Sequence, residues 1–206
     1  SDSLVGGGGN DTIVADSGND TINAGAGVDS INAGAGNDVL VFSSASELDA
    51  DVTVIGGSET DTIRLDTGST TLTLADADFA DVIQVENLDL TGTAAQTVTL
   101  GAQTNEAFAS GITITTNATA TSLNLQGSAS TVSINATGTN NADTLVGGSA
   151  NDTLDAGSGG GSVSGGGGAD TIYWSGAGNT TIVGGDGDDN IDADSDQTGA
   201  DRIEGD

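Results

Sequence analysis

The sequence of 206 residues contains no cysteine, proline, methionine or histidine, and its only basic residues are Arg64 and Arg202. Without cysteine there can be no disulfide bond. Without histidine, cysteine or lysine, most of the groups that serve nucleophilic and general acid–base catalysis are missing. Aromatic residues are also scarce, with one tryptophan, one tyrosine and three phenylalanines. We therefore expect neither a disulfide scaffold nor an enzyme.

Negative charge dominates what is present, since 31 acidic residues give the chain a formal net charge of -29. Such a chain repels nucleic acid and anionic membrane surfaces, so we expect no nucleic-acid binding and no membrane insertion, and a cation is the natural partner. No stretch approaches the length of about 20 apolar residues that crosses a membrane. The start also lacks the features of a secretory signal peptide, which predicts either another export signal or an internal fragment.

Glycine is abundant, with 34 residues, and much of it falls in a nine-residue repeat. Four units follow one another over residues 6–41: GGGGNDTIV, ADSGNDTIN, AGAGVDSIN and AGAGNDVLV. Each unit has glycine at its fourth position, aspartate at its sixth and an aliphatic residue at its eighth. Acidic chains with few aromatic residues are commonly disordered, but disorder does not require apolar residues at a fixed period. The repeat therefore predicts a folded, repetitive structure.

A second array of units begins near Gly138 with GTNNADTLV and GGSANDTLD. Between the arrays only GGSETDTIR, from Gly56, keeps the pattern, and short β-rich runs such as TTLTLAD and QTVTLGA replace it. Residues 76–88, DADFADVIQVENL, form the one stretch with helical character. We therefore divide the chain into a first array at residues 1–41, a β-rich middle section at residues 42–137 and a second array at residues 138–206.

The nine-residue period suits a coil made of two units, each with one short strand and one glycine-rich turn. Because side chains alternate along a strand, the aspartate and the aliphatic residue of a unit point to the same side, and the residue between them points away. Successive coils would stack at about 4.8 Å. Aspartates two units apart then lie one above the other, so that Asp2, Asp20 and Asp38 form one column and Asp11 and Asp29 form another.

Bare carboxylates at such spacing repel one another, and a divalent cation between them reverses the sign of the interaction. Ca²⁺ accepts about six to eight oxygen ligands in flexible geometry, and glycine turns let main-chain carbonyls converge on it. Magnesium demands a tighter octahedron, and zinc or copper would want the histidine and cysteine that the chain lacks. We therefore predict several bound calcium ions. The aspartates expected to hold them are Asp2, Asp11, Asp20, Asp29, Asp38, Asp61, Asp143, Asp152, Asp170, Asp189 and Asp201. The glycines expected to shape their loops are Gly6, Gly7, Gly9, Gly18, Gly25, Gly27, Gly34, Gly36, Gly147, Gly148, Gly165, Gly166, Gly168, Gly184, Gly185 and Gly187.

The second array departs from the pattern on one side. One of its columns keeps every aspartate, at Asp152, Asp170 and Asp189. The other column runs through Asp143, Gly161, Thr180 and Asp201, so its two central acids are missing. We expect a run of ions along the Asp152 edge and fewer ions along the opposite edge.

Two other features carry less specific signals. Arg64 and Arg202 each follow a repeat aspartate by a few residues, which predicts local ion pairs on the outer surface. Tyr173 and Trp174 could stack on a sugar, although such a pair more often pads a turn.

The nonapeptide units resemble the GGxGxDxUx repeats of RTX (repeats in toxin) proteins. The resemblance covers residues 2–41 and 138–206 and, in the middle section, only residues 56–64. It implies an all-β fold, with an RTX-type parallel β-roll or β-solenoid at both ends and a less regular, β-rich, solenoid-like middle section without calcium sites. It also implies type I secretion from a Gram-negative bacterium in an unfolded state, followed by folding outside the cell when the chain meets calcium.

Two classes of function stay open. The first is an extracellular structural protein of the bacterial cell surface, similar to surface-layer (S-layer) proteins, in which calcium triggers folding and self-association into a lattice or tandem array. The bias toward glycine, alanine, threonine, serine and aspartate suits this function, and so does the long β-rich stretch between Asp89 and Asp143, in which Glu106 is the only acid. The second is a stalk or ligand-binding segment of an RTX adhesin, or the C-terminal secretion module of a type I secreted enzyme or toxin.

Overall fold

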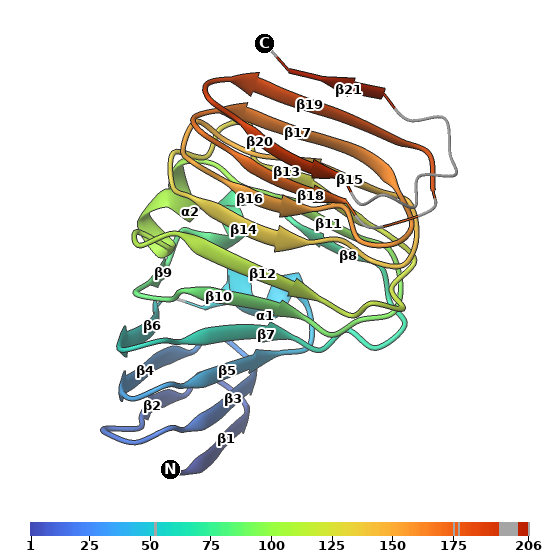
Figure 1. Cartoon of the computed structure of the whole chain (residues 1–206). Coiled ribbons are helices and arrows are strands. Elements are labelled where there is room, and N and C mark those ends of the chain that lie inside the picture. Colours follow the sequence, from blue (N-terminus) through green and yellow to red (C-terminus); the bar gives the residue numbers. More distant parts are fainter. Residues whose placement is uncertain (52, 175, 177, 194–201, 206) are drawn as a thin grey trace.

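The computed structural model of the chain describes residues 1–51, 53–174, 176, 178–193 and 202–205. Short strands stack along one axis into a solenoid that runs from the N-terminus at one end to the C-terminus at the other (Figure 1). All of the strand pairs formed by these residues are parallel. Parallel pairing between successive coils is the arrangement that a repeat of this kind predicts. The expected all-β solenoid is therefore confirmed.

One side of the solenoid is a ten-stranded sheet that takes one strand from each coil. In spatial order its strands are β1 (Ser3–Gly8), β3 (Thr21–Ala26), β5 (Val39–Phe42), β7 (Thr62–Leu65), β10 (Asn87–Leu90), β12 (Ile112–Thr116), β14 (Ile134–Thr137), β16 (Thr153–Asp155), β18 (Thr171–Trp174) and β20 (Asn190–Ala193).

The opposite side is divided into two sheets. The four-stranded sheet belongs to the N-terminal part of the chain and contains β2 (Thr12–Val14), β4 (Ser30–Ala35), β6 (Thr53–Ser58) and β9 (Val82–Ile83). The seven-stranded sheet follows it along the axis and contains β8 (Leu72–Leu74), β11 (Gln96–Thr99), β13 (Leu123–Gln126), β15 (Asp143–Val146), β17 (Gly161–Gly167), β19 (Thr180–Asp186) and β21 (Arg202–Glu204).

Three short helices lie where these two sheets meet. They are α1 (Ala45–Ala50), the 3₁₀ helix η1 (Asp76–Phe79) and α2 (Ala102–Ala107). They come from successive coils and pack in a column, with η1 between α1 and α2. Helix α1 also contacts β8, and α2 contacts β9. Each α-helix thus covers the edge strand of a sheet, which would otherwise present unpaired backbone groups.

The helices differ from the sequence-based expectation. Within residues 76–88 only Asp76–Phe79 is helical, and Val82–Ile83 joins the four-stranded sheet as β9. Phe79, Val82 and Val85 are each 1% exposed, so the coil buries these three apolar side chains although they do not lie on one face of a helix. Helices α1 and α2 were not expected at all, because each has only six residues and shows no clear helical periodicity.

A capping signal at α1 was nevertheless present in the sequence. The Ser44 side chain accepts a hydrogen bond from the Glu47 N–H at 3.3 Å, and the Glu47 carboxylate accepts one from the Ser43 N–H at 2.6 Å. This arrangement is close to the serine–glutamate capping box that begins many helices.

The arrays show the alternation that the repeat predicts. Asp20 and Ile22 are buried at 2% and 1% exposure, while Thr21 between them is exposed. Coils in the first array repeat every 18 residues, whereas the coil from Thr62 to Asn87 spans 25 residues. The insertions therefore lengthen the turns and add helices without breaking the stack of strands.

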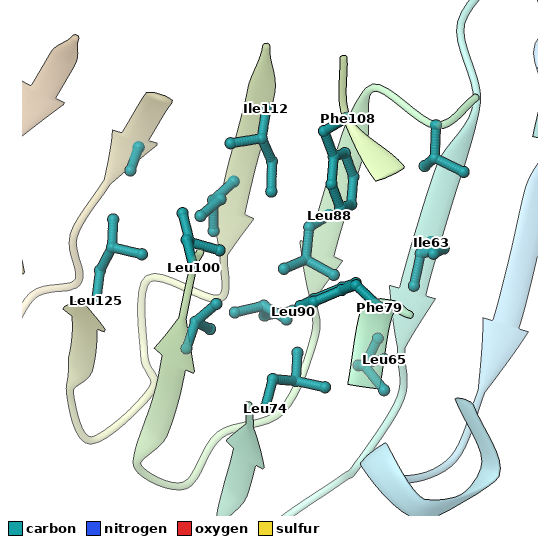
Figure 2. Close-up of a cluster of buried hydrophobic side chains, with 14 of the residues drawn as sticks. Ile63, Leu65, Leu74, Phe79, Leu88, Leu90, Leu100, Phe108, Ile112 and Leu125 are labelled. Atoms are coloured by element: carbon teal, nitrogen blue, oxygen red, sulfur yellow. The ribbon is translucent and has the colours of Figure 1, made fainter. Parts of the chain in front are cut away.

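The hydrophobic core runs the length of the solenoid as a narrow column of isoleucine, leucine and valine, and it is broadest in the middle section. There Phe79 and Phe108 pack edge to face, with ring centroids 5.5 Å apart. Leu65, Leu88 and Leu90 lie in the same cluster (Figure 2). The middle section thus buries more apolar volume per coil than the arrays do.

The remaining predictions about single residues have clear outcomes. Trp174 is 2% exposed and pads the core, whereas Tyr173 is 43% exposed on the outer surface. The Arg64 guanidinium forms an ion pair with Asp89 at 2.9 Å, and Arg202 pairs with Glu204, so both expected local ion pairs are confirmed. Within the described ranges no helix is long and apolar enough to cross a membrane.

Candidate metal centre

The repeat aspartates of the first array form two stacked columns. In one column the Oδ1 atoms of Asp20, Asp38 and Asp61 accept hydrogen bonds from the N–H groups of the aspartates one coil earlier, at 2.5, 2.8 and 2.9 Å. In the other column Asp29 accepts from the Asp11 N–H at 2.8 Å. The predicted vertical alignment is therefore confirmed.

The second array repeats this arrangement on its complete side. Asp170 accepts from the Asp152 N–H at 2.8 Å, and Asp189 accepts from the Asp170 N–H at 3.0 Å. On the other side Asp143, Gly161 and Thr180 lie in register on neighbouring strands, as the sequence predicts. The predicted ligand Asp201 lies outside the described residues.

Most of these carboxylates use only one of their two oxygens. Among the residues that the structure describes, six Oδ2 atoms are buried and have no hydrogen-bond partner: those of Asp11, Asp20, Asp29, Asp38, Asp61 and Asp170. Five of the six residues are at most 2% exposed, and Asp11 is half-buried. An unpaired carboxylate oxygen in such a place is strongly unfavourable unless a cation neutralises it.

The first position of the unit is small for all six aspartates: it is glycine for Asp11, Asp61 and Asp170, and alanine for Asp20, Asp29 and Asp38. A Cβ on Gly6 would lie 2.6 Å from Asp11 Oδ2 and 2.5 Å from the Ala24 carbonyl oxygen of the next coil. A Cβ on Gly165 would lie 2.2 Å from Asp170 Oδ2 and 2.5 Å from the Gly184 carbonyl oxygen. A carboxylate oxygen and a main-chain carbonyl from adjacent coils therefore face the same small space.

The other predicted glycines occupy the turns of these loops. Ten of them have φ in the left-handed region, which disfavours any side chain: Gly7, Gly9, Gly18, Gly25, Gly34, Gly36, Gly166, Gly168, Gly185 and Gly187. The rest lie against neighbouring atoms that a Cβ would strike within 2.6 Å, and these are Gly6, Gly27, Gly147, Gly148, Gly165 and Gly184. All of the predicted glycines except Gly7 and Gly9 of the first coil pack against another coil or a loop carboxylate.

Two aspartates of the second array are satisfied by their own loops. Asp152 Oδ2 accepts from the Gly148 N–H, and Asp143 Oδ2 accepts from the Thr139 N–H, both at 2.6 Å. Their Oδ1 atoms accept from the N–H groups of Ile134 and Leu123 one coil earlier. These two carboxylates therefore depend less on a cation than the six with an unpartnered oxygen.

When no cation is bound, burial and neighbouring negative charges disfavour the ionised form of the loop carboxylates. Burial, with a smaller contribution from neighbouring acids, raises the pKa of three groups from 3.8 to about 6: Asp51, Asp61 and Asp152. Burial also raises the pKa of Asp170, and the Asp189 charge adds to the effect. These loops are thus built for a state in which a positive charge sits beside the carboxylates.

The donor set fits calcium. Among the described residues no three carboxylates converge on one point, so main-chain carbonyls must complete any coordination shell. Carboxylates, carbonyls and water are the hard oxygen donors that Ca²⁺ takes in large and flexible numbers. In the first array the ions would be held by the column aspartates and the carbonyls of the glycine-rich turns, and calcium would supply the charge that the columns lack.

Two carboxylates in the columns were not predicted from the sequence. Asp51, at the end of α1, accepts from the Asp29 N–H at 2.9 Å and so continues the second column. Glu86 accepts from the Asp61 N–H at 2.8 Å and so continues the first. The signal for Glu86 was available, because Glu86 to Asp89 reads as the last four positions of a unit with glutamate in place of aspartate. Asp51 was hidden by the inserted helix.

At the fifth position of the repeat, asparagine side chains form a second set of hydrogen bonds between coils, which was not predicted from the sequence. Here asparagine Oδ1 atoms accept from backbone N–H groups one coil later, opposite in direction to the aspartate bonds. The four pairs are Asn10 with Val28, Asn19 with Asn37, Asn37 with Thr60, and Asn151 with Ala169.

Comparison with known proteins agrees with this geometry. The family model described as the RTX calcium-binding nonapeptide repeat (4 copies) matches residues 2–40, 137–172 and 174–206, which is more than half of the chain. No curated protein and no solved structure gives a significant match. Repeats of this family bind calcium, and proteins that carry them are typically secreted. The chain belongs to the RTX calcium-binding nonapeptide repeat family.

Proposed function

We propose that this chain is a calcium-dependent structural component of a bacterial surface layer, in which calcium first folds the solenoid and then permits lateral self-association. The observation that carries the first step is the set of six buried and unpartnered carboxylate oxygens in stacked columns. No arginine compensates them, because Arg64 and Arg202 pair with Asp89 and Glu204. A bound cation is the one partner that completes these loops.

The energetics support a calcium trigger outside the cell. Extracellular calcium modules have dissociation constants of about 10⁻⁴ to 10⁻³ M. At ten times that concentration each site stabilises the fold by about 1.4 kcal/mol. Five such sites supply about 7 kcal/mol, which is comparable to the whole stability of a typical domain, about 5 to 15 kcal/mol. At the far lower calcium concentration of a cytosol the same sites contribute almost nothing.

The outer face of the seven-stranded sheet supports the second step. From β8 to β19 its outward side chains are mostly hydroxyl or amide groups, and the one exposed charge is Asp186 at the end of β19; the uncharged set is Thr73, Thr97, Thr99, Asn124, Gln126, Thr144, Val146, Ser162, Ser164, Thr181 and Val183. In a chain with a net charge of -29 this is the face that a second copy can approach with least repulsion. An uncharged sheet face of this kind favours a contact between copies of the chain.

Electron microscopy after addition of calcium tests the assembly step. We expect ordered sheets from the wild-type chain. Ser162→Asp, on the uncharged face, should fold normally by circular dichroism but lose the sheets. Thr153→Asp, on the outer face of the ten-stranded sheet, is the matched control and should keep them. Monodisperse rods from the wild-type chain would instead support a stalk or ligand-binding segment of an adhesin, or the secretion module of an exported enzyme or toxin.

We also propose that this segment has no catalytic activity of its own. The sequence lacks histidine, cysteine and lysine. Its buried aspartates accept hydrogen bonds from the backbone of the adjacent coil, an arrangement that serves stacking and cation binding. Incubation of the calcium-loaded chain with peptide, ester and glycoside substrates should therefore give no turnover.

A further inference from the structure

The coil that contains β7 lies outside the residues matched by the family model, yet Asp61 in it has the surroundings of a repeat aspartate. Asp61 is fully buried, and its Oδ1 accepts from the Asp38 N–H at 2.9 Å. Its Oδ2 has no partner. A buried oxygen of this kind marks a place where a positive group belongs.

A main-chain carbonyl faces the same place. A Cβ on Gly56 would lie 2.8 Å from Asp61 Oδ2 and 2.1 Å from the Gln84 carbonyl oxygen. The glycine therefore keeps open a small space between oxygens of adjacent coils, as Gly165 does between Asp170 and the Gly184 carbonyl in the second array. The turn that provides the carbonyl is unlike the repeat turns, since Gln84 replaces glycine there and adopts a φ of 58°.

A second carboxylate completes the set. Glu86 Oε2 accepts from the Asp61 N–H at 2.8 Å, the role that the next aspartate fills elsewhere in the column. The negative charges of Asp61, Glu86 and the nearby Glu59 are close enough to repel one another. The nearest arginine along the chain, Arg64, points outward and pairs with Asp89, so it does not offset them.

We propose that Asp61, the Gln84 carbonyl and Glu86 form a calcium site outside the residues matched by the family model, where the first array gives way to the middle section. The proposal rests on the calcium dependence proposed above. It places the last ion of this column on a glutamate and on a turn without glycine, neither of which belongs to the repeat. It also extends the calcium-bound part of the chain beyond residues 2–40, which the family model matches, to Glu86, so that calcium reaches the coil that carries β10.

The substitution Glu86→Gln tests whether Glu86 acts as a calcium ligand or only as a hydrogen-bond acceptor for the Asp61 backbone. Glutamine keeps an oxygen that can accept the Asp61 N–H, but it removes the charge that attracts calcium. Glu106→Gln is the control, because Glu106 is an exposed acid on α2 and its loss changes the net charge equally. Native mass spectrometry of the whole chain in calcium counts the ions, and circular dichroism at saturating calcium checks the fold.

We expect Glu86→Gln to fold in calcium with one bound ion fewer than the wild-type chain, and Glu106→Gln to bind the wild-type number. An unchanged count for Glu86→Gln would overturn the proposal, and so would failure of this variant to fold in saturating calcium, since that would show a structural role. As a second variant, Asp61→Asn removes the charge of the other carboxylate and should also lose one ion. Asp192→Asn, which neutralises an exposed acid on β20, should lose none.

These outcomes are distinct from failure of the proposed function. If the wild-type chain binds no calcium or folds equally well in chelator, the calcium trigger itself is wrong. If the wild-type chain responds to calcium but Glu86→Gln and Asp61→Asn both bind the full number of ions, only the site at the boundary is wrong.

Discussion

Replacing Asp61 by asparagine should change stability in a way that depends on calcium. Asparagine keeps the Oδ1 atom that accepts a hydrogen bond from the Asp38 N–H. Its neutral NH₂ group takes the place of the unpartnered Oδ2, near the Gln84 carbonyl. Burial, followed by the charges of Asp38, Glu86 and Glu59, raises the pKa of Asp61 from 3.8 to about 6. At about 1.36 kcal/mol per pKa unit, the ionised carboxylate disfavours the folded state by up to about 3 kcal/mol at pH 7.

Without calcium, Asp61→Asn should therefore be more stable than the wild-type chain by up to about 3 kcal/mol. Calcium removes this advantage, because the wild-type carboxylate gains about 1.4 kcal/mol at ten times the dissociation constant and about 2.7 kcal/mol at 100 times. The two proteins should thus converge near the higher concentration. If the Asp61 carboxylate binds two calcium ions, the two proteins should reach equal stability already near ten times the dissociation constant.

The free energy of unfolding can be followed by far-UV circular dichroism across a calcium series. Where the chain does not fold unaided, titration with an osmolyte such as trimethylamine N-oxide drives folding, and where it does fold, urea unfolds it. Asp192→Asn, an exposed neutralisation on β20, is the control and should track the wild-type chain. A difference between Asp61→Asn and the wild-type chain that stays constant at every calcium concentration would refute the reasoning.

Three further predictions follow from the same loops and from the core. In chelator, lowering the pH from 7 to 5 should stabilise the fold by about 1 kcal/mol per group with a raised pKa. The sign follows because, between the unfolded pKa of 3.8 and the folded pKa of about 6, the folded state binds more protons than the unfolded state. The stabilisation is therefore complete below pH 3.8 and is lost as the pH rises through about 6. The groups are Asp51, Asp61 and Asp152. A pH series of osmolyte-induced folding in chelator measures this effect, and greater stability at pH 7 than at pH 5 would contradict it. Asp170→Asn removes the charge of a carboxylate whose Oδ2 has no partner, so calorimetric titration should show a lost or weakened site, whereas the exposed Asp192→Asn should titrate as wild type. Leu88→Ala removes a fully buried side chain and should cost about 3 kcal/mol by denaturant unfolding, equally at low and high calcium, and a calcium-dependent cost would show that core and loops are not independent.

The arrays could be predicted from the sequence because each unit repeats the same local rules. The period fixes which residues stack, strand alternation fixes which side faces the core, and glycine marks the tight turns. Asp20, Asp38 and Asp170 accordingly lie where the spacing places them. The expected edge with missing acids, through Gly161 and Thr180, follows from the same register.

The middle section could not be predicted to the same depth, because its turns vary in length. The side opposite the ten-stranded sheet divides into two sheets where α1, η1 and α2 are inserted between strands, and six-residue helices carry little periodic signal. The insertion of α1 also hid Asp51, since the interval from Asp29 grows from 18 to 22 residues. Glu86 was missed for a different reason, namely that the repeat specifies aspartate at that position.

The division between satisfied and unsatisfied carboxylates needed atomic positions. Asp152 and Asp170 are equivalent in the repeat, yet Asp152 Oδ2 accepts the Gly148 N–H while Asp170 Oδ2 has no partner. The sequence assigns both the same role. The structure instead predicts that calcium matters more at Asp170 than at Asp152.

An anomalous difference map from crystals grown in calcium tests the central claim most directly. We expect peaks about 2.3 to 2.6 Å from the oxygens that lack a partner in the protein, the usual distance for calcium ligands. These oxygens are the Oδ2 atoms of Asp11, Asp20, Asp29, Asp38, Asp61 and Asp170. A well-folded chain with no peak beside any of them, at millimolar calcium, would contradict the account.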